Sequence, residues 1–310
     1  MALISHASPE PLVSVVLPTR NRLEFLRRAT ASVLAQSERN LELLVVDDAS
    51  TDGTAAYLSD LTARDDRVRV VRNSIAMGGA GARNQGIQQS RGAWVAFIDD
   101  DDEWMPAKLQ RQLATLAANS AAVACSCSYV KHVRSGRSKR VPVPMQVSLQ
   151  QLLATNHLGG ASMCICSGRV LREIGGFDPK LRSAQDLDLW VRLRLRGEIV
   201  SCGETLVVLS VHEGPRISNN MQSLYEGARR FYFKHRRLMD KALRRHRLAY
   251  NCFIMSRQAT RGLRYRYRHL LMCVHNSSGE YSLGYLRSSA PRLVRDACVR
   301  AFTSLSGSAL

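Results

Sequence analysis

The sequence lacks the features of a membrane-spanning, secreted or cysteine-ligated metal protein. No apolar run reaches the roughly 18 residues of a membrane-spanning helix. The stretch from Met1 to Pro11 has no basic segment followed by an apolar run, so we expect no secretory signal and a cytoplasmic chain. The 8 cysteines show no C-x-x-C spacing, and we interpret them as buried thiols instead of metal ligands.

Acidic residues are scarce in the last part of the chain. The 310 residues contain 44 Lys+Arg and 26 Asp+Glu, for a net charge of +18. The segment from Met221 to Leu310 holds 18 basic and 4 acidic residues, whereas everything before it carries only +4. Hydrophobic residues make up 45% of the chain and charged residues 23%, which excludes a mainly disordered protein.

The first hundred residues alternate between strand and helix patterns. Short apolar runs predict buried strands at 13–17, 41–46, 68–71 and 93–98, with helices between them. This order, with short connections, is typical of an open parallel sheet covered by helices on both faces. Ligands of such sheets bind beyond the carboxyl ends of the strands. Polar clusters lie at those ends, at 18–21, 47–48, 73 and 99–102.

The pattern changes after Pro106. Helices are predicted at 106–118, 149–155, 169–174 and 186–195, and strands at 122–129, 163–166 and 205–211. A basic turn at 134–137 could close a hairpin, and after His212 the chain becomes helical and rich in arginine.

The acidic run from Phe97 to Trp104 is the most informative feature. Four successive aspartates at the end of a buried strand repel one another, so a fold retains them only with a cation or solvent. In an extended segment, Asp99 and Asp101 would point to one side and Asp100 and Asp102 to the other. Paired carboxylates suit Mg²⁺ or Mn²⁺, and a solvated turn that caps the next helix is the alternative. Further acidic residues at 47–48 and the cation Arg83 favour a site here.

Seven motifs follow one another along about two thirds of the chain: Val13–Asn21, Val45–Thr54, Gly81–Asn84, Arg91–Gly92, Phe97–Trp104, Gly175–Asp178 and Gln185–Trp190. Together they resemble the inverting family-2 glycosyltransferases of GT-A fold. The resemblance implies a GT-A fold, a Rossmann-like, mainly parallel α/β sheet with helices on both faces, and it ends near His212. The basic helical C-terminal extension is predicted from the charge and the helical pattern of the last residues. We therefore expect a flexible tail at 1–10, a GT-A catalytic domain at 11–218 and a basic, mainly helical region at 219–310. Residues 11–105 would form the nucleotide-binding half and 106–218 the acceptor half.

The resemblance also implies roles for individual residues. Asp186 would be the catalytic base that takes the proton of the acceptor hydroxyl, although Gln185 stands where the family usually has Glu. A divalent ion, Mg²⁺ or Mn²⁺, would bind Asp99, Asp101 and His212. Because Asp100 fills the variable position of the D-x-D motif with another carboxylate, this register can shift by one residue. The implied nucleotide-binding residues are Pro18, Thr19, Asn21, Asp48, Arg83 and Asp99.

Trp104 and Trp190 follow acidic motifs, and we favour core packing over stacking on a sugar for both. Asp188 is interpreted as structural.

The implied function is metal-dependent, inverting transfer of a sugar from a nucleotide-sugar, expected to be a UDP-sugar, to a glycan or lipid-linked acceptor in surface polysaccharide synthesis. A nucleotidyltransferase is one alternative, because such enzymes also join Asp clusters to a parallel sheet. A catalytically silent, basic membrane or nucleic-acid adaptor is the other.

The basic C-terminal region has the pattern of a helix on an anionic surface. Apolar residues at 231, 238, 239 and 242 form a stripe flanked by cations, which favours a peripheral position on the inner face of the cell membrane. A second basic block at 261–268 repeats the pattern. Nucleic acid is the rival partner, but no nucleic-acid-binding motif accompanies the charge. A solvated helical cap is the third interpretation.

Overall fold

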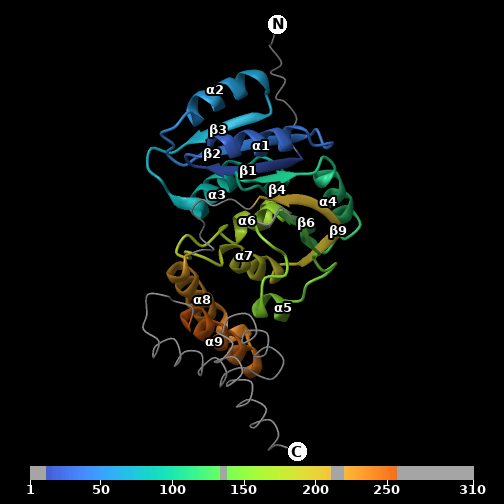
Figure 1. Cartoon of the computed structure of the whole chain (residues 1–310). Coiled ribbons are helices and arrows are strands. Elements are labelled where there is room, and N and C mark those ends of the chain that lie inside the picture. Colours follow the sequence, from blue (N-terminus) through green and yellow to red (C-terminus); the bar gives the residue numbers. More distant parts are fainter. Residues whose placement is uncertain (1–11, 133–137, 211–219, 257–310) are drawn as a thin grey trace, which may run out of the picture. The chain divides into compact units, whose positions relative to one another are not determined.

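The structure is a computed structural model that describes residues 12–132, 138–210 and 220–256 (Figure 1). It divides the chain into two compact units, which are considered separately. The first comprises Met1–Leu152, Asn156–Pro179 and Asp186–Glu213, and the second comprises Leu153–Thr155, Lys180–Gln185 and Gly214–Leu310. The predicted tail at 1–10, the turn at 134–137, His212 and the basic block at 261–268 lie outside the described residues.

The predicted alternation of strands and helices in the first hundred residues is confirmed. Each strand is a short run of buried apolar side chains, and each helix buries one apolar face. The elements are β1 (Val13–Thr19), α1 (Leu23–Leu34), β2 (Leu41–Asp47), α2 (Thr54–Arg64), β3 (Val68–Arg72), α3 (Gly78–Gln89) and β4 (Trp94–Phe97).

The second half of the first unit contains two strands that the sequence patterns did not predict in full. β5 is short and polar, and it forms by antiparallel pairing with β9. β9 begins at Glu198, seven residues before the predicted start at 205. The sequence pattern missed this first part because Gly203, which has a φ of +71°, looks like a turn. Met163, predicted to start a strand, ends the 3-10 helix η1 instead. The elements are β5 (Asp102–Trp104), α4 (Lys108–Ala117), β6 (Ala122–His132), β7 (Ser138–Val141), α5 (Leu149–Ala154), η1 (Ala161–Met163), β8 (Ile165–Ser167), α6 (Gly168–Glu173), α7 (Gln185–Arg194) and β9 (Glu198–Leu209).

The strands form one mixed sheet in the order β3-β2-β1-β4-β8-β6-β9-β5, with β7 added beside β6. The first four of these strands are mutually parallel, β4 and β6 pair with β8 in the antiparallel sense, and β6 and β9 are parallel. The chain moves outward from β1 to β3 and then returns to β4 on the other side of β1. Right-handed crossovers therefore place α1 and α2 on one face of the sheet and α3 on the other.

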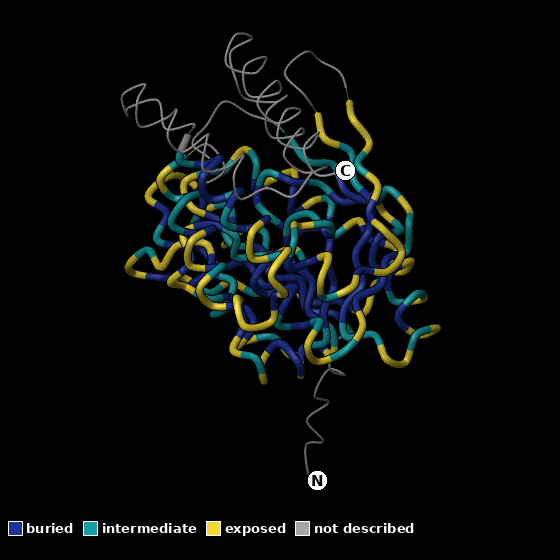
Figure 2. Tube along the Cα trace, turned by 90° about the horizontal axis from the view of Figure 1, so that it is seen from below, coloured by how far each residue is buried: buried dark blue, intermediate teal, exposed yellow. Residues whose placement is uncertain are grey.

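The central strands and the helices beside them supply the core, and buried residues gather in the interior, drawn in dark blue in Figure 2. Val13, Val15, Val16 and Leu17 of β1 are all fully buried. Helix α3 approaches β1 closely at Gly86, where an added Cβ would lie 2.3 Å from the Val16 Cγ1 atom. The glycine at this position lets α3 sit directly on the sheet.

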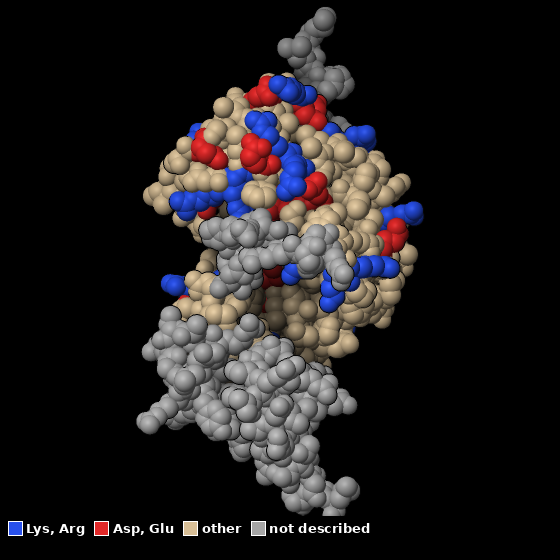
Figure 3. All heavy atoms as spheres, viewed as in Figure 1, with Lys and Arg blue, Asp and Glu red and all other residues tan. Residues whose placement is uncertain are grey.

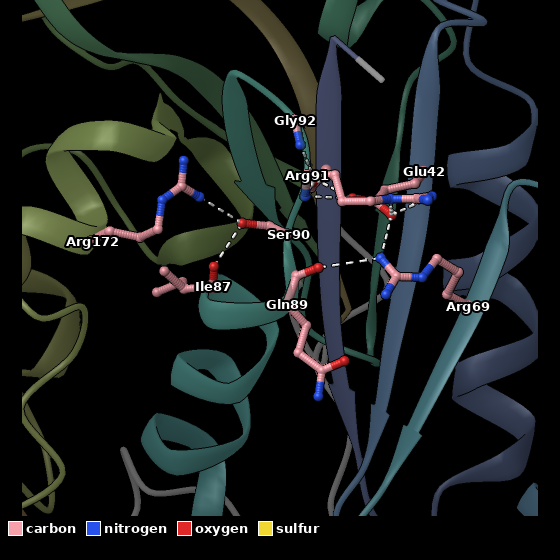
Figure 4. A network of polar contacts seen from close by, with 9 residues as sticks. Glu42, Arg69, Ile87, Gln89, Ser90, Arg91, Gly92 and Arg172 are labelled. Carbon is pink, nitrogen blue, oxygen red and sulfur yellow. Dashed lines mark hydrogen bonds and ion pairs between the residues drawn. The ribbon is translucent and has the colours of Figure 1, made fainter. Parts of the chain in front are cut away.

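A buried carboxylate anchors the amino ends of the parallel strands, at the edge opposite the predicted site (Figure 4). The Glu42 side chain on β2 is 2% exposed and contacts Arg69 of β3 at 2.7 Å and Arg91, before β4, at 3.0 Å. The Ser14 hydroxyl of β1 donates to it at 2.6 Å. Glu42 therefore connects three neighbouring parallel strands and the segment that leads into the fourth.

The second unit contains α8 (Met221–His235), the 3-10 helix η3 (Arg236–Leu238) and α9 (Lys241–Ser256). Phe231 is fully buried, and the Arg247 guanidinium lies 4.4 Å from the centroid of its ring. Gly227 lies so close to Ser183 that an added Cβ would be 2.2 Å from its Oγ atom. The helical character predicted for this part of the chain is confirmed up to Ser256. Among the described residues, no helix has the length and apolarity needed to cross a membrane.

Candidate active site

The acidic run forms a tight turn between β4 and β5 instead of an extended segment. The Asp102 backbone N–H donates to the Asp99 carbonyl oxygen at 3.0 Å. The predicted alternation of side chains is therefore wrong, because the chain reverses direction within the run. Oxygens of Asp99, Asp101 and Asp102 lie within 4.8 Å of one another, so Asp102 joins the pair that the sequence indicated. A turn prediction from four successive polar residues could have found this third carboxylate.

Asp100 is not part of this cluster and is held by Thr19 and Arg22, at the end of β1 and just before α1. The Thr19 hydroxyl donates to it at 2.9 Å, and Arg22 contacts it at 2.8 Å. The same Arg22 nitrogen lies 3.5 Å from Asp101. Arg22 was not identified from the sequence, and it supplies part of the positive charge that allows four carboxylates to share one turn.

Arg83 on α3 lies between two carboxylates that belong to different parts of the site. Its guanidinium pairs with Asp99 and is attracted by the charge of Asp186. It lies 5.4 Å from the centroid of the Phe177 ring. Its side chain is 12% exposed, and its Nε atom has no hydrogen-bond partner among the described residues. A buried cation with an unused donor is suited to bind an anion such as a phosphate.

Asp186, the predicted base, lies in the first turn of α7. Its side chain is half-buried, and the loss of water around it raises the pKa of its carboxyl group to about 6. The charge of Arg83 opposes the increase, and the charge of Asp99 adds to it. A carboxylate with a pKa near neutrality is suited to accept a proton at physiological pH.

The residues beside Asp186 have structural contacts. The Gln185 side chain donates to the Leu181 carbonyl oxygen at 2.7 Å, so this amide ties α7 to the preceding loop. Asp188 is fully buried and pairs with Arg192 at 2.8 Å, which agrees with its interpretation as structural. Trp190 is fully buried as well, and Trp104 is 4% exposed, so the expected packing of both tryptophans is confirmed.

The residues predicted to hold the nucleotide surround the ends of β1 and β2. The Asp48 carboxylate accepts hydrogen bonds from Asn73 at 2.9 Å and from the backbone of Met77 and Gly78 at 2.8 Å each. It therefore caps the amino end of α3. Asn21 bridges two loops, because its side chain accepts from the Thr51 N–H at 2.7 Å. Pro18 lies within β1.

The Gly175–Gly176 turn is connected to α3. Both glycines have positive φ values, +76° and +63°. The Asn84 side chain accepts from the Phe177 N–H at 2.7 Å and donates to its carbonyl oxygen at 2.8 Å. This double contact holds the Phe177 ring against Arg83 and 5.2 Å from Phe97. Sequence analysis did not predict this connection, because 93 residues separate the two partners.

A mixed sheet with an acidic turn beyond its strand ends is the arrangement of GT-A glycosyltransferases, and structural comparison confirms the fold. The chain resembles S. aureus TarS 1-349 in complex with UDP-GlcNAc, with a TM-score of 0.66 and 18% identity over 94% of this chain and 88% of that one. It also resembles the mannosyltransferase PcManGT from Pyrobaculum calidifontis in complex with GDP-Man and Mn2+, with a TM-score of 0.59 and 17% identity over 96% of this chain and 81% of that one.

The chain belongs to glycosyl transferase family 2, whose sequence pattern matches residues 14–174, more than half of its length. It is 29% identical over 242 residues to the putative colanic acid biosynthesis glycosyl transferase WcaA of Escherichia coli K12, with 77% of this chain and 86% of the relative covered. It is 32% identical over 193 residues to the putative teichuronic acid biosynthesis glycosyltransferase TuaG of Bacillus subtilis, with 61% and 74% covered. The predicted enzyme class is thereby confirmed, and the nucleotidyltransferase alternative loses its support.

Proposed function

We propose that this enzyme transfers a sugar from a nucleotide-sugar, a UDP-sugar, to a glycan or lipid-linked acceptor in bacterial surface polysaccharide synthesis, with inversion and with the help of a divalent metal. The observation that carries the proposal is the grouping of the acidic turn, Arg83 and Asp186 in one unit. The relatives' names support the biological setting. One relative, from Escherichia coli, is named a UDP-Glc:alpha-D-GlcNAc-diphosphoundecaprenol beta-1,3-glucosyltransferase, WfgD; it is 37% identical over 109 residues, which are 35% of this chain and 42% of that relative.

In the proposed mechanism, this chain's residues bind the donor and remove one proton. Arg83 exchanges part of its contact with Asp99 for the diphosphate, and its Nε–H provides a further donor. Asp186 accepts the proton of the acceptor hydroxyl while the hydroxyl oxygen bonds to the anomeric carbon from the face opposite the leaving group. The bond between that carbon and the diphosphate oxygen breaks, and the nucleoside diphosphate leaves with the bonding electrons.

The three clustered carboxylates fit a hard divalent cation. Asp99, Asp101 and Asp102 offer only oxygen ligands within 4.8 Å of one another, as Mg²⁺ or Mn²⁺ requires. When bound, the ion would neutralise charge on the leaving diphosphate. Asp100 is engaged by Thr19 and Arg22, which favours the register with Asp99 and Asp101. The role of His212 as a further ligand stays a prediction.

The proposal is tested by thermal stabilisation with a panel of nucleoside diphosphates, with and without Mn²⁺. A ligand that binds only the native state raises the melting temperature according to its affinity. We expect UDP to stabilise the protein and the effect to need the metal. A folded sample that responds to no nucleotide would contradict the donor site and favour the silent adaptor.

We further propose that the enzyme works at the inner face of the cell membrane, where a lipid-linked acceptor would reside. The support is the excess of basic residues in the second unit and the lipid-linked acceptor in the relative's name. Nucleic acid is not proposed as a partner.

A further inference from the structure

The second unit has a strongly basic face. Between Arg229 and Arg245, eight Lys and Arg residues are exposed, and Asp240 is the one acidic residue in this stretch of the sequence. On the visible face of the first unit, by contrast, acidic and basic side chains are mixed (Figure 3). The exposed cations are Arg229, Arg230, Lys234, Arg236, Arg237, Lys241, Arg244 and Arg245.

Two large apolar side chains are exposed among these cations. Phe233 is 50% exposed and Leu238 is 36% exposed. The guanidinium groups of Arg229 and Arg236 lie 5.4 Å and 5.1 Å from the centroid of the Phe233 ring. Neighbouring Phe231 is fully buried, so the packing of α8 uses a different aromatic residue. The exposed Phe233 ring and the cations beside it could therefore bind a partner that has both an apolar and an anionic part.

We infer that this basic–aromatic face, formed by α8, η3 and α9, docks on an anionic lipid bilayer. The exposed cations would lie among negative headgroups, while Phe233 and Leu238 enter the boundary between headgroups and acyl chains. Charge alone would also suit a nucleic acid, but an exposed leucine finds no partner on a phosphate backbone. The inference deepens the proposed function by naming the surface that meets the membrane, and it rests on that function only for the identity of the acceptor.

The test is sedimentation of the full chain with vesicles rich in phosphatidylglycerol and with vesicles of phosphatidylcholine alone. We expect binding to the anionic vesicles and a loss of about fivefold in the partition coefficient for each cation removed in the variant R237Q/K241Q. The variant F233S/L238S keeps the charge and is expected to bind at least several-fold more weakly. The control K139Q/R140Q removes the same charge from exposed residues of β7 and is expected to bind like the wild type.

Two results would overturn the inference. One is that wild-type protein does not sediment with anionic vesicles. The other is a combined result: F233S/L238S binds anionic vesicles as strongly as wild type does, and wild type binds a DNA duplex as strongly as it binds the vesicles. That result would mean that the face binds any polyanion. UDP stabilisation with Mn²⁺ is measured on every variant, so that a defective donor site is not mistaken for a defective docking face.

A separate observation concerns Ser162, a fully buried residue of η1 that contacts both sides of the acidic turn. Its hydroxyl accepts from the Asp99 backbone N–H at 3.0 Å. Its carbonyl oxygen accepts from the Trp104 Nε1–H at 3.0 Å. These two bonds hold Asp99, the first residue of the turn, and Trp104, two residues after its last residue.

The segment around Ser162 is itself fixed by the core. The buried Gln112 amide on α4 donates to the Met163 carbonyl oxygen at 2.8 Å and to the Cys125 carbonyl oxygen at 2.9 Å. Its own oxygen accepts from Lys108, a fully buried amine, at 2.8 Å. The Lys108 amine lies 3.8 Å from the centroid of the Trp104 ring. One polar network therefore extends from the core to the acidic turn.

The geometry points to Ser162 as a positioning residue for the metal site, an inference that rests on the proposed metal dependence. Loss of its hydroxyl would free the Asp99 backbone and allow the turn to change shape. Groups that orient metal ligands typically change the affinity by about 10- to 100-fold when they are removed.

The test is the dissociation constant for Mn²⁺ alone, measured by titration of the S162A variant. We expect it to rise about 10- to 100-fold. The control is S126A, which removes another fully buried hydroxyl, one that donates to the Leu158 carbonyl oxygen at 3.1 Å, and should leave the Mn²⁺ affinity unchanged. If wild type binds Mn²⁺ and S162A binds it equally well, Ser162 has no positioning role. If wild type does not bind Mn²⁺, the proposed metal site fails first.

Discussion

Replacement of Glu42 by glutamine tests how strongly the buried ion-pair network stabilises the sheet (Figure 4). Glu42 accepts hydrogen bonds from the Ser14 hydroxyl at 2.6 Å and from the Arg91 backbone N–H at 2.8 Å. It also pairs with the guanidinium groups of Arg69 and Arg91. A glutamine side chain at this position can keep one acceptor oxygen, but it loses the charge and turns an amide toward two cations.

The expected loss follows from burial. Removal of one partner from a buried ion pair costs about 3–5 kcal/mol. Arg69 and Arg91 are 34% and 54% exposed and can turn partly toward water, so we expect about 3 kcal/mol for this variant. For a unit of this size, that corresponds to a fall of roughly 6–12 °C in melting temperature.

The assay is urea unfolding followed by tryptophan fluorescence, because all 3 tryptophans, Trp94, Trp104 and Trp190, lie in the first unit. The control is Glu173→Gln, which breaks the exposed pair with Arg169 and should cost less than about 1 kcal/mol. Equal midpoints for the two variants, or a Glu42→Gln loss below about 1 kcal/mol, would refute the reasoning.

The stability lost through Glu42→Gln should also depend on pH. Burial alone would raise the pKa of Glu42, but hydrogen bonds from Ser14 and the Arg91 backbone, with the Arg69 contact, lower it below the ordinary value. A lowered pKa in the folded state stabilises the protein above the unfolded pKa of about 4.3 and ceases to do so as the pH falls through the folded pKa. The difference in stability between wild type and Glu42→Gln should therefore shrink in acid. A difference that stays constant down to acidic pH would contradict this linkage.

Three further predictions concern the reaction. Asp186→Asn should lower the rate of transfer by about 10²- to 10⁴-fold while UDP binding stays nearly intact, as checked by turnover and thermal shift, and retained turnover would remove Asp186 as the base. Because the pKa of Asp186 is raised to about 6 and the base must be deprotonated, the wild-type rate should rise with pH through about 6 and then level off. A flat profile between pH 5 and 7 would contradict that assignment. Asp101→Ala should abolish the part of UDP affinity that depends on Mn²⁺, and unchanged affinity with and without the ion would move the metal site elsewhere.

Much of the fold and part of the site could be predicted from sequence, because those features depend on local pattern. Buried strands such as β1 and β2 are continuous apolar runs, and α1 repeats its apolar side chains at helical spacing. Parallel strands place their carboxyl ends at one edge, so the positions of Asp48 and of the acidic run followed from strand order. The family motifs then identified Arg83 and Asp186 as candidates.

The tertiary structure decided which side chains meet. Strand β5 forms only because β9 lies beside it, and neither its polar residues nor its length predicts a strand. The separation of Asp100 from its neighbours depends on a backbone turn and on Arg22, which is distant in sequence. Ser162 and Phe177 reach the site through partners 63 and 93 residues away. The spacing of apolar residues in the sequence shows which face of a helix or strand is buried. It does not show which residues of distant elements meet, because those contacts form only when whole helices and strands pack against one another.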